Sequence, residues 1–254
     1  MQLNYKSFGK GDPIVILHGL FGTLDNWQTI ARQLAAQYTV YIVDQRNHGR
    51  SPHLAEMNYL LMAQDLKEFM ESQWMYKAHI VGHSMGGKTA MQFAHEYPDM
   101  VDSLVVIDIA PKTYADGHTP IFDALMNLNV DALETRKQAD DFLRQSIRDY
   151  SVRQFLLKNL TRSKSGGFQW KMNLPVIHKY YPDILQATRG DQPFEGRTLF
   201  VKGSHSPYIQ TEDEAMIFTQ FPNAKIEVVR NAGHWVHAEA PAALLALLLH
   251  CFEM

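Results

Sequence analysis

The stretch VGHSMGGKTA, residues 81–90, places Ser84 between Gly82 and Gly86 directly after a short apolar run. This G-x-S-x-G spacing is typical of a tight strand-to-helix turn that holds a serine in a strained conformation with its hydroxyl exposed. Glycines suit the flanking positions because a Cβ there would collide with the neighbouring strand or helix. A five-residue pattern also arises by chance, so the role of this serine depends on the remainder of the chain.

Short apolar, β-branched runs alternate with helical patterns along most of the chain. Strands buried on both faces are predicted at residues 13–19, 39–44, 78–84, 103–110, 197–203 and 224–229. Helices are predicted at residues 25–37, 59–72, 86–97 and 241–252. This alternation predicts an α/β fold built on a mostly parallel, doubly wound sheet.

The alternation stops between Ala110 and Glu195, where helical patterns occur without a convincing strand. Residues 112–192 contain 12 Lys and Arg against 9 Asp and Glu, a balance of +3, whereas the remainder of the chain carries −6. We therefore expect a helical insertion, residues 111–194, between two strands of a core formed by residues 1–110 and 195–254. This cap segment would lie over the carboxyl edge of the sheet, where open α/β sheets bind ligands.

Composition narrows the class of protein. A chain of 254 residues with 46% hydrophobic and 20% charged residues fits one globular domain with a small insertion. A net charge of −3 gives no reason to expect a nucleic-acid partner. The single cysteine, Cys251, excludes an internal disulfide and gives no support to a cysteine-based metal site.

The N-terminus lacks a signal pattern, so a cytoplasmic location is expected. The longest apolar run, residues 240–252, is shorter than the ~20 residues that span a bilayer, so no membrane span is predicted.

A serine hydroxyl is a poor nucleophile unless a base takes its proton. The segment NAGHWVHAEAP, residues 231–241, supplies His234 after the last predicted strand. Its place well after Ser84 follows the chain order Ser, acid, His. By contrast, His48, His83 and His237 are more typical of structural histidines.

Attack on a carbonyl creates an oxyanion that needs preorganised N–H donors. The backbone N–H of Met85, directly after the serine, is one candidate. In ILHGLFGTLDNW, residues 16–27, His18 and Gly19 end a predicted strand and turn the backbone N–H of Leu20 toward the same edge. A phosphate-binding role for this loop is a weak alternative, because both the G-x-G-x-x-G pattern and a Gly-Lys-Ser/Thr sequence are missing.

Four segments together resemble the α/β-hydrolase superfamily, most of all its small bacterial esterases, which hydrolyse acyl esters and thioesters. They are HGLFG at 18–22, DQRNHGRS at 44–51, GHSMGG at 82–87 and GHWVHAEAP at 233–241. The resemblance implies Ser84 as nucleophile, His234 as base, and the Leu20 and Met85 N–H groups as oxyanion donors. This serine chemistry requires no metal or organic cofactor. The candidate substrate contacts beside these positions are Phe21, His83 and Trp235.

The acid departs from the superfamily pattern, since VKGSHSPY, residues 201–208, has no carboxylate where one is usual. Glu212 and Asp213 follow later, where they read as charges at a helix start. Asp108 is the better candidate because it ends the strand after that of Ser84, where a carboxylate is costly unless it has a partner such as an imidazole N–H. Its alternative role is to tie down the cap segment through backbone hydrogen bonds. Ser206 is a candidate auxiliary contact to His234.

These features favour a serine esterase acting on small-molecule carboxylic esters or thioesters through an acyl-enzyme. The basic residues Lys158, Arg162 and Lys164 raise acyl-CoA as a substrate, although such basic clusters are common and a solvated helical surface is the favoured explanation for them. Two alternatives remain open: a C–C bond hydrolase or lyase on the same fold, and a small-molecule receptor that retains the triad to bind its ligand. The acyl length, the leaving group and the oligomeric state depend on features that the sequence does not specify.

Overall fold

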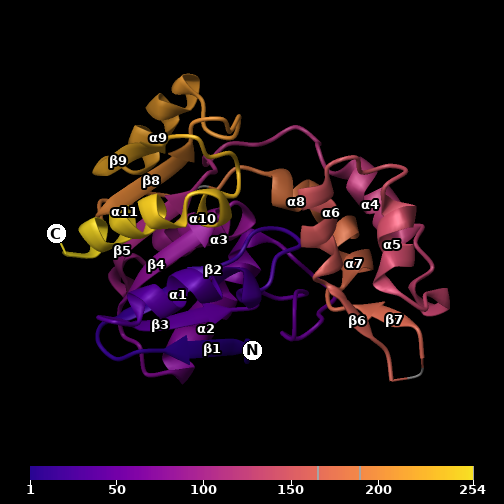
Figure 1. Ribbon diagram of the computed structural model, residues 1–254. Helices are drawn as coiled ribbons and strands as arrows, with labels where there is room; N and C mark the ends of the chain where they lie inside the picture. The colour runs from indigo at the N-terminus through magenta and orange to yellow at the C-terminus, as the bar shows by residue number, and fades with distance from the viewer. Residues whose placement is uncertain (165, 189, 254) are drawn as a thin grey trace.

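The computed structural model describes residues 1–164, 166–188 and 190–253. Its centre is a seven-stranded sheet with the strand order β1-β3-β2-β4-β5-β8-β9 (Figure 1). Among the strand pairs described for this sheet, β1 with β3 is antiparallel and the others are parallel, so the predicted mostly parallel sheet is confirmed. The strands are β1 Tyr5–Phe8, β2 Pro13–Leu17, β3 Thr39–Val43, β4 Ala78–His83, β5 Val101–Ile107, β8 Thr198–Gly203 and β9 Ala224–Val229.

Helices cover both faces of this sheet. One face packs against α1 (Gln28–Leu34) and α11 (Pro241–Glu253). The other packs against α2 (Tyr59–Ser72), α3 (Met85–Glu96) and α9 (Glu214–Gln220). Short 3-10 turns and one short helix, α10, complete the core: Leu24–Trp27, Pro98–Met100, Thr211–Asp213 and α10 Val236–Glu239.

Alternation of side chains along the central strands explains their unbroken apolar sequences. In β5, Leu104 and Val106 belong to the α2–α3 side, whereas Val105 and Ile107 belong to the α1–α11 side. Because successive side chains of a strand point to opposite faces, both sets must be apolar when helices cover both faces.

Three local features differ from the sequence expectations. The edge strand β1 was not predicted because its sequence, YKSF, has no apolar run. In the structure this strand is partly exposed. The predicted helix at 25–37 begins instead with a separate 3-10 turn, at which Thr23 and Asn26 form a capping box. The expectation of no strand in the cap segment is wrong, since β6 (Leu160–Arg162) and β7 (Phe168–Trp170) form an antiparallel hairpin too short to show a periodicity.

The cap segment begins at the carboxyl edge of the sheet, directly after β5. The chain then re-enters the sheet at the start of β8, which lies at the opposite edge because β5 and β8 are parallel (Figure 1). The cap segment packs around an apolar cluster of its own, to which core residues such as Phe21 and Met85 also contribute. Its elements are α4 Thr119–Met126, a 3-10 turn Val130–Ala132, α5 Arg136–Leu143, α6 Tyr150–Leu157, β6, β7, α7 Leu174–Lys179 and α8 Tyr181–Leu185. Over the described ranges, no helix has the length and apolar character that crossing a membrane requires.

Candidate active site

Ser84 occupies the turn between β4 and α3 with a φ of 52° and a ψ of −120°. A positive φ is strained for a residue with a Cβ and persists only where the surroundings enforce it. A Cβ on Gly82 would lie 2.2 Å from the Gly86 carbonyl oxygen, and one on Gly86 would lie 2.5 Å from that of Leu17. The two glycines therefore allow strand, turn and helix to approach closely enough to form this turn.

Asp108 and His234, 126 residues apart in sequence, meet at the carboxyl edge of the sheet. The Asp108 side chain is fully buried, and its Oδ2 lies 2.7 Å from His234 Nδ1. Its Oδ1 accepts the Gly203 N–H at 3.0 Å. Since Nδ1 of the imidazole donates to the carboxylate, the lone pair of Nε2 is available to a second partner.

Ser206 was expected to contact His234, but the structure places it on the carboxylate instead. Its hydroxyl donates a short hydrogen bond to Asp108 Oδ2 and accepts the Tyr208 N–H at 3.3 Å. The Ser206 oxygen accepts the Tyr208 N–H, and the Asp108 carboxylate can only accept. The Ser206 proton is therefore directed toward Asp108. Ser206 thus reaches the imidazole only through Asp108.

The rival acids lie elsewhere. Asp213 forms an ion pair with Lys112 at 2.7 Å and accepts the Gln210 N–H at 2.8 Å at the start of a 3-10 turn. Glu212 is exposed in the same turn. Both therefore behave as the helix-start charges that the sequence suggested.

The loop after β2 contains a four-residue turn in which the Gly22 N–H donates to the Gly19 carbonyl at 2.9 Å. His18 supports this turn: its Nδ1 lies 2.8 Å from the same carbonyl oxygen, and its Nε2 accepts the Gln45 N–H at 3.0 Å. Burial lowers the pKa of His18 to about 4, so the ring is neutral at neutral pH and carries its proton on Nδ1. Sequence reasoning used His18 only as the end of a strand and missed this contact.

The peptide between Gly19 and Leu20 is oriented by these bonds. In a planar trans peptide the N–H points opposite to the C=O, so fixing the Gly19 oxygen also aims the Leu20 N–H. Among the described residues, no acceptor engages the N–H of Leu20 or that of Met85 at the start of α3. Both residues line cavities that Ser84 also lines.

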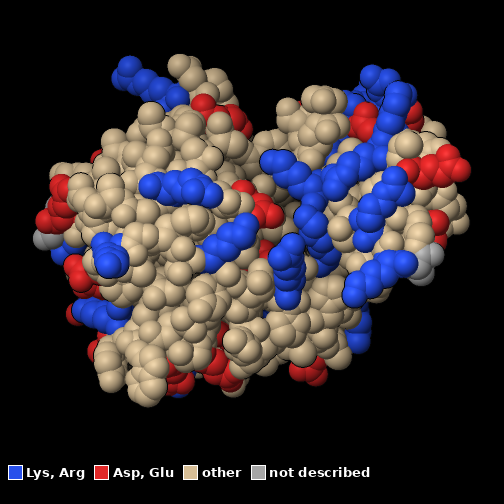
Figure 2. Space-filling view, turned by 60° about the horizontal axis from the view of Figure 1, so that its bottom comes forward, with Lys and Arg blue, Asp and Glu red and all other residues tan. Residues whose placement is uncertain are grey.

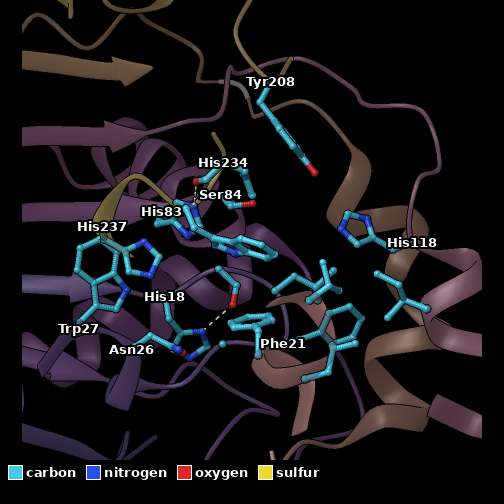
Figure 3. Close-up of a pocket in the computed structure, with 18 residues that line it drawn as sticks. His18, Phe21, Asn26, Trp27, His83, Ser84, His118, Tyr208, His234 and His237 are labelled. Carbon is cyan, nitrogen blue, oxygen red and sulfur yellow. Dashed lines mark hydrogen bonds between the residues drawn. The ribbon is translucent and has the colours of Figure 1, made fainter. Parts of the chain in front are cut away.

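Two cavities meet at Ser84. The first cavity, about 240 Å³, is also lined by His234 and includes the candidate contacts Phe21, His83 and Trp235 (Figure 3). The second cavity, about 280 Å³, lies toward α3 and the two ends of the cap segment. It is lined by Ser84, Met85, Lys88, Ile109, Tyr114, Tyr181, Ile184 and others.

Tyr208 borders both cavities and was missed by the sequence analysis. Its ring stacks on that of His234, with centroids 4.0 Å apart and planes 18° from parallel. It projects from the loop after β8 toward the cavity shown in Figure 3. Because the stacking covers one face of the imidazole, it restricts the orientations open to the ring.

Burial lowers the pKa of the three histidines that the sequence analysis interpreted as structural. Burial and the neighbouring His234 hold the pKa of His83 well below its usual value, and its Nε2 donates to the His234 carbonyl at 2.8 Å. The same two causes lower the pKa of His237 to about 4, and its ring stacks on Trp27. Burial lowers the pKa of His48 to about 3. His83 and His237 still present part of their rings to the first cavity.

Lys88 lies one helical turn after Ser84 and is only 1% exposed. Its Nζ donates to the carbonyl oxygens of Lys112, Leu185 and Gln186 at 2.8, 3.1 and 2.5 Å. Burial, followed by the charge of Lys112, lowers its pKa to about 7. These carbonyls belong to the two ends of the cap segment, so Lys88 ties both ends to α3. The sequence analysis did not identify Lys88. The signal that could have identified it is a lysine on the apolar side of the helix predicted at residues 86–97.

In the described part of the chain, no group of three or more His, Cys, Asp or Glu side chains is arranged to hold a metal.

Comparison with known proteins places these features in context. A family model described as the alpha/beta hydrolase fold matches residues 12–241. The chain is 41% identical to "Esterase YbfF" of Escherichia coli strain K12 over 240 residues, which cover 93% of this chain and 91% of that protein. It is 38% identical to "sn-1-specific diacylglycerol lipase ABHD11" of Danio rerio, with coverages of 98% and 82%. A solved structure described as "Marine microorganism esterase" has 42% identity and a TM-score of 0.96, with 98% of each chain covered.

Proposed function

This chain belongs to the alpha/beta hydrolase family, and from that premise we propose that it is a serine esterase that cleaves carboxylic esters or thioesters through an acyl-enzyme. Relatives named esterase and lipase support ester hydrolysis. The observation that carries the serine mechanism is the 2.7 Å contact between Asp108 and His234, beside a strained Ser84 that lines the same cavity as His234.

In the proposed mechanism, His234 Nε2 takes the proton of Ser84 as its Oγ attacks the substrate carbonyl carbon. The Leu20 and Met85 N–H groups stabilise the oxyanion of the tetrahedral intermediate. When the intermediate collapses, the leaving group takes the proton back from His234. Water then attacks the acyl-enzyme and gives a proton to His234. The bond between Ser84 Oγ and the acyl carbon breaks as the Ser84 oxygen takes that proton back, and the carboxylic acid is released. Asp108 keeps the imidazole in the required tautomer and stabilises its charged form.

We assign the two halves of the substrate to the two cavities. The leaving atom must receive its proton from His234, so the leaving group belongs in the first cavity, which His234 lines. The acyl chain then extends into the second cavity. There, the hydroxyls of Tyr59 and Tyr114 already donate to the carbonyls of Ile184 and Tyr208, both at 2.6 Å. A wall whose polar groups are satisfied internally favours an unsubstituted aliphatic chain.

The cap segment, residues 111–194, acts in this proposal as a lid. It contributes His118 to both cavities, Phe155 to the first, and Tyr181 to the second. By covering the carboxyl edge of the sheet, it excludes water from the acyl transfer and sets the length of acyl chain that fits.

Detection of the acyl-enzyme tests the proposal directly. We expect a mass increase of one acyl group on Ser84 after rapid acid quenching during turnover of p-nitrophenyl esters of graded acyl length. Sustained release of p-nitrophenol distinguishes an esterase from a receptor that reacts once. Attachment of a fluorophosphonate to a serine other than Ser84 would refute the assignment of the nucleophile. If the protein cleaves a β-diketone but does not hydrolyse esters, a C–C hydrolase would be favoured instead.

A coenzyme A thioester is the finer substrate proposal. Lys158, Arg162 and Lys164 are exposed on the cap segment, and Figure 2 shows Lys and Arg side chains gathered on that part of the molecule. The charge of Lys158 contributes to the lowered pKa of His237, which lines the first cavity, so Lys158 lies near the proposed leaving-group side. A polyanionic leaving group would be attracted to this surface.

Salt dependence decides whether this attraction contributes. Exposed charges are screened over ~8–10 Å near physiological ionic strength, so kcat/KM for an acyl-CoA should fall with added NaCl more steeply than for a neutral ester. Lys158→Glu should reduce the difference between the two salt slopes. Lys77→Glu, at the opposite edge of the sheet beside Asp102, is the matched control and should leave it unchanged. Equal slopes for both substrates in the wild type would exclude the attraction.

A further inference from the structure

Phe21, in the turn that follows β2, has a φ of 59°. It is the third residue of the turn closed by the Gly22 N–H on the Gly19 carbonyl. A positive φ at this position is required by a type II turn and is normally supplied by glycine, since it is strained for a residue that has a Cβ. Something outside the turn must therefore hold Phe21 in this conformation.

The contacts that hold Phe21 come from the cap segment. Its ring packs edge-on against Phe122 of α4, with centroids 5.0 Å apart, and lies 6.2 Å from the ring of His118. Its carbonyl oxygen accepts a hydrogen bond of 2.6 Å from Nδ2 of Asn159, a residue 1% exposed between α6 and β6. Both the side chain and the backbone of this strained residue are thus held by residues far along the chain.

Asn159 is itself fixed in place and directed at this carbonyl. Its backbone N–H donates to Leu156 at 3.0 Å, and its carbonyl accepts the Lys171 N–H at 2.8 Å. The two acceptors near its amide are the carbonyl oxygens of Phe21 and Leu156, so the amide nitrogen must face them. Its Oδ1 is buried and has no partner among the described residues. An unpaired buried oxygen is unfavourable, and the 2.6 Å bond donated to Phe21 offsets part of that cost.

We propose that Asn159 is a positioning residue through which the cap segment sets the oxyanion donor of Leu20. The bond to the Phe21 carbonyl stabilises the positive φ of Phe21, and this φ closes the turn onto the Gly19 oxygen. That oxygen, held also by His18, fixes the peptide whose opposite side is the Leu20 N–H. A cap segment that moves away from the core would release Phe21 and with it the donor. The inference rests on the proposed serine mechanism.

Asn159→Leu tests the inference, because leucine has a similar shape but cannot donate to the carbonyl. Complete loss of an oxyanion donor costs ~10²–10³ in kcat, and a donor that is present but misaligned should cost about tenfold. We expect that fall in kcat with little change in KM, together with faster hydrogen exchange at the amides of residues 20–22. If this variant does not fold, Asn159→Ala replaces it, because alanine likewise cannot donate and adds no polar group to the buried position.

Asn173→Leu is the matched control, since Asn173 also joins the cap segment to the core through its amide, 3.2 Å from Asn47 Oδ1, without contacting the turn. It should retain the wild-type kcat even if the melting temperature falls. An unchanged kcat in the Asn159 variants would overturn the inference, as would an equal loss of kcat in Asn173→Leu. Neither result would affect the proposed function as long as the wild-type protein hydrolyses esters. A wild-type protein that forms no acyl-enzyme would overturn both.

Discussion

Ser84→Ala will abolish ester turnover and leave the protein folded. In the proposed mechanism the Ser84 oxygen forms the covalent bond to the acyl group, and alanine offers no atom for that bond. The largest loss of activity is therefore expected here, down to the level that binding and the oxyanion donors alone provide, which in serine protease triads is ~10³–10⁴ over water. Steady-state hydrolysis of an activated ester and labelling by a fluorophosphonate measure the loss.

The same substitution also provides its own structural control. Ser84 has a φ of 52°, a conformation in which alanine is strained to a similar degree as serine, so stability should change little. An unaltered thermal transition with no turnover and no label would support Ser84 as the nucleophile. Substantial turnover by the folded variant would contradict it.

Asp108→Asn is expected to have the second largest effect, a loss of about 10³–10⁴ in kcat, because the equivalent change in a serine protease triad lowers kcat by about 10⁴. Oδ1 of Asp108 accepts the Gly203 N–H, so the asparagine oxygen should remain there and its NH₂ group should face His234. The imidazole would then accept at Nδ1 and carry its proton on Nε2. In that tautomer it cannot take the proton of Ser84.

Backbone strain does not confuse this test, because Asp108 has a φ of 53° and asparagine tolerates the left-handed region as well as aspartate does. A buried group left without its partners can still unfold a protein, so the thermal transition must be measured beside kcat. Asp213→Asn serves as the comparison, since Asp213 pairs with Lys112 instead. Near-normal kcat in folded Asp108→Asn, or a greater loss in Asp213→Asn, would place the acid elsewhere.

Much of the core could be predicted from sequence because its signals are local. Helices on both faces require unbroken apolar strands, and such runs are visible at β2, β4, β5 and β8. The edge strand β1 and the hairpin β6–β7 were missed for the opposite reason. They are three or four residues long and partly exposed, and tertiary contacts provide the stability that their own sequences do not indicate. The strand β1 pairs with β3, and the hairpin packs on the apolar cluster of the cap segment through Leu160 and Phe168.

The sequence by itself determined the turn at Ser84, because the spacing of two glycines around one serine specifies a backbone conformation within five residues. It also determined the order of Ser84, Asp108 and His234 along the sheet, because successive parallel strands bring their carboxyl ends to one edge. Only the tertiary structure decided that the Ser206 hydroxyl bonds to Asp108 and that Asn159 holds the loop of Leu20. These hydrogen bonds join residues 98 and 138 positions apart. Such a bond depends on the position of each side chain to within a few tenths of an ångström, and only the packing of the folded chain sets that position.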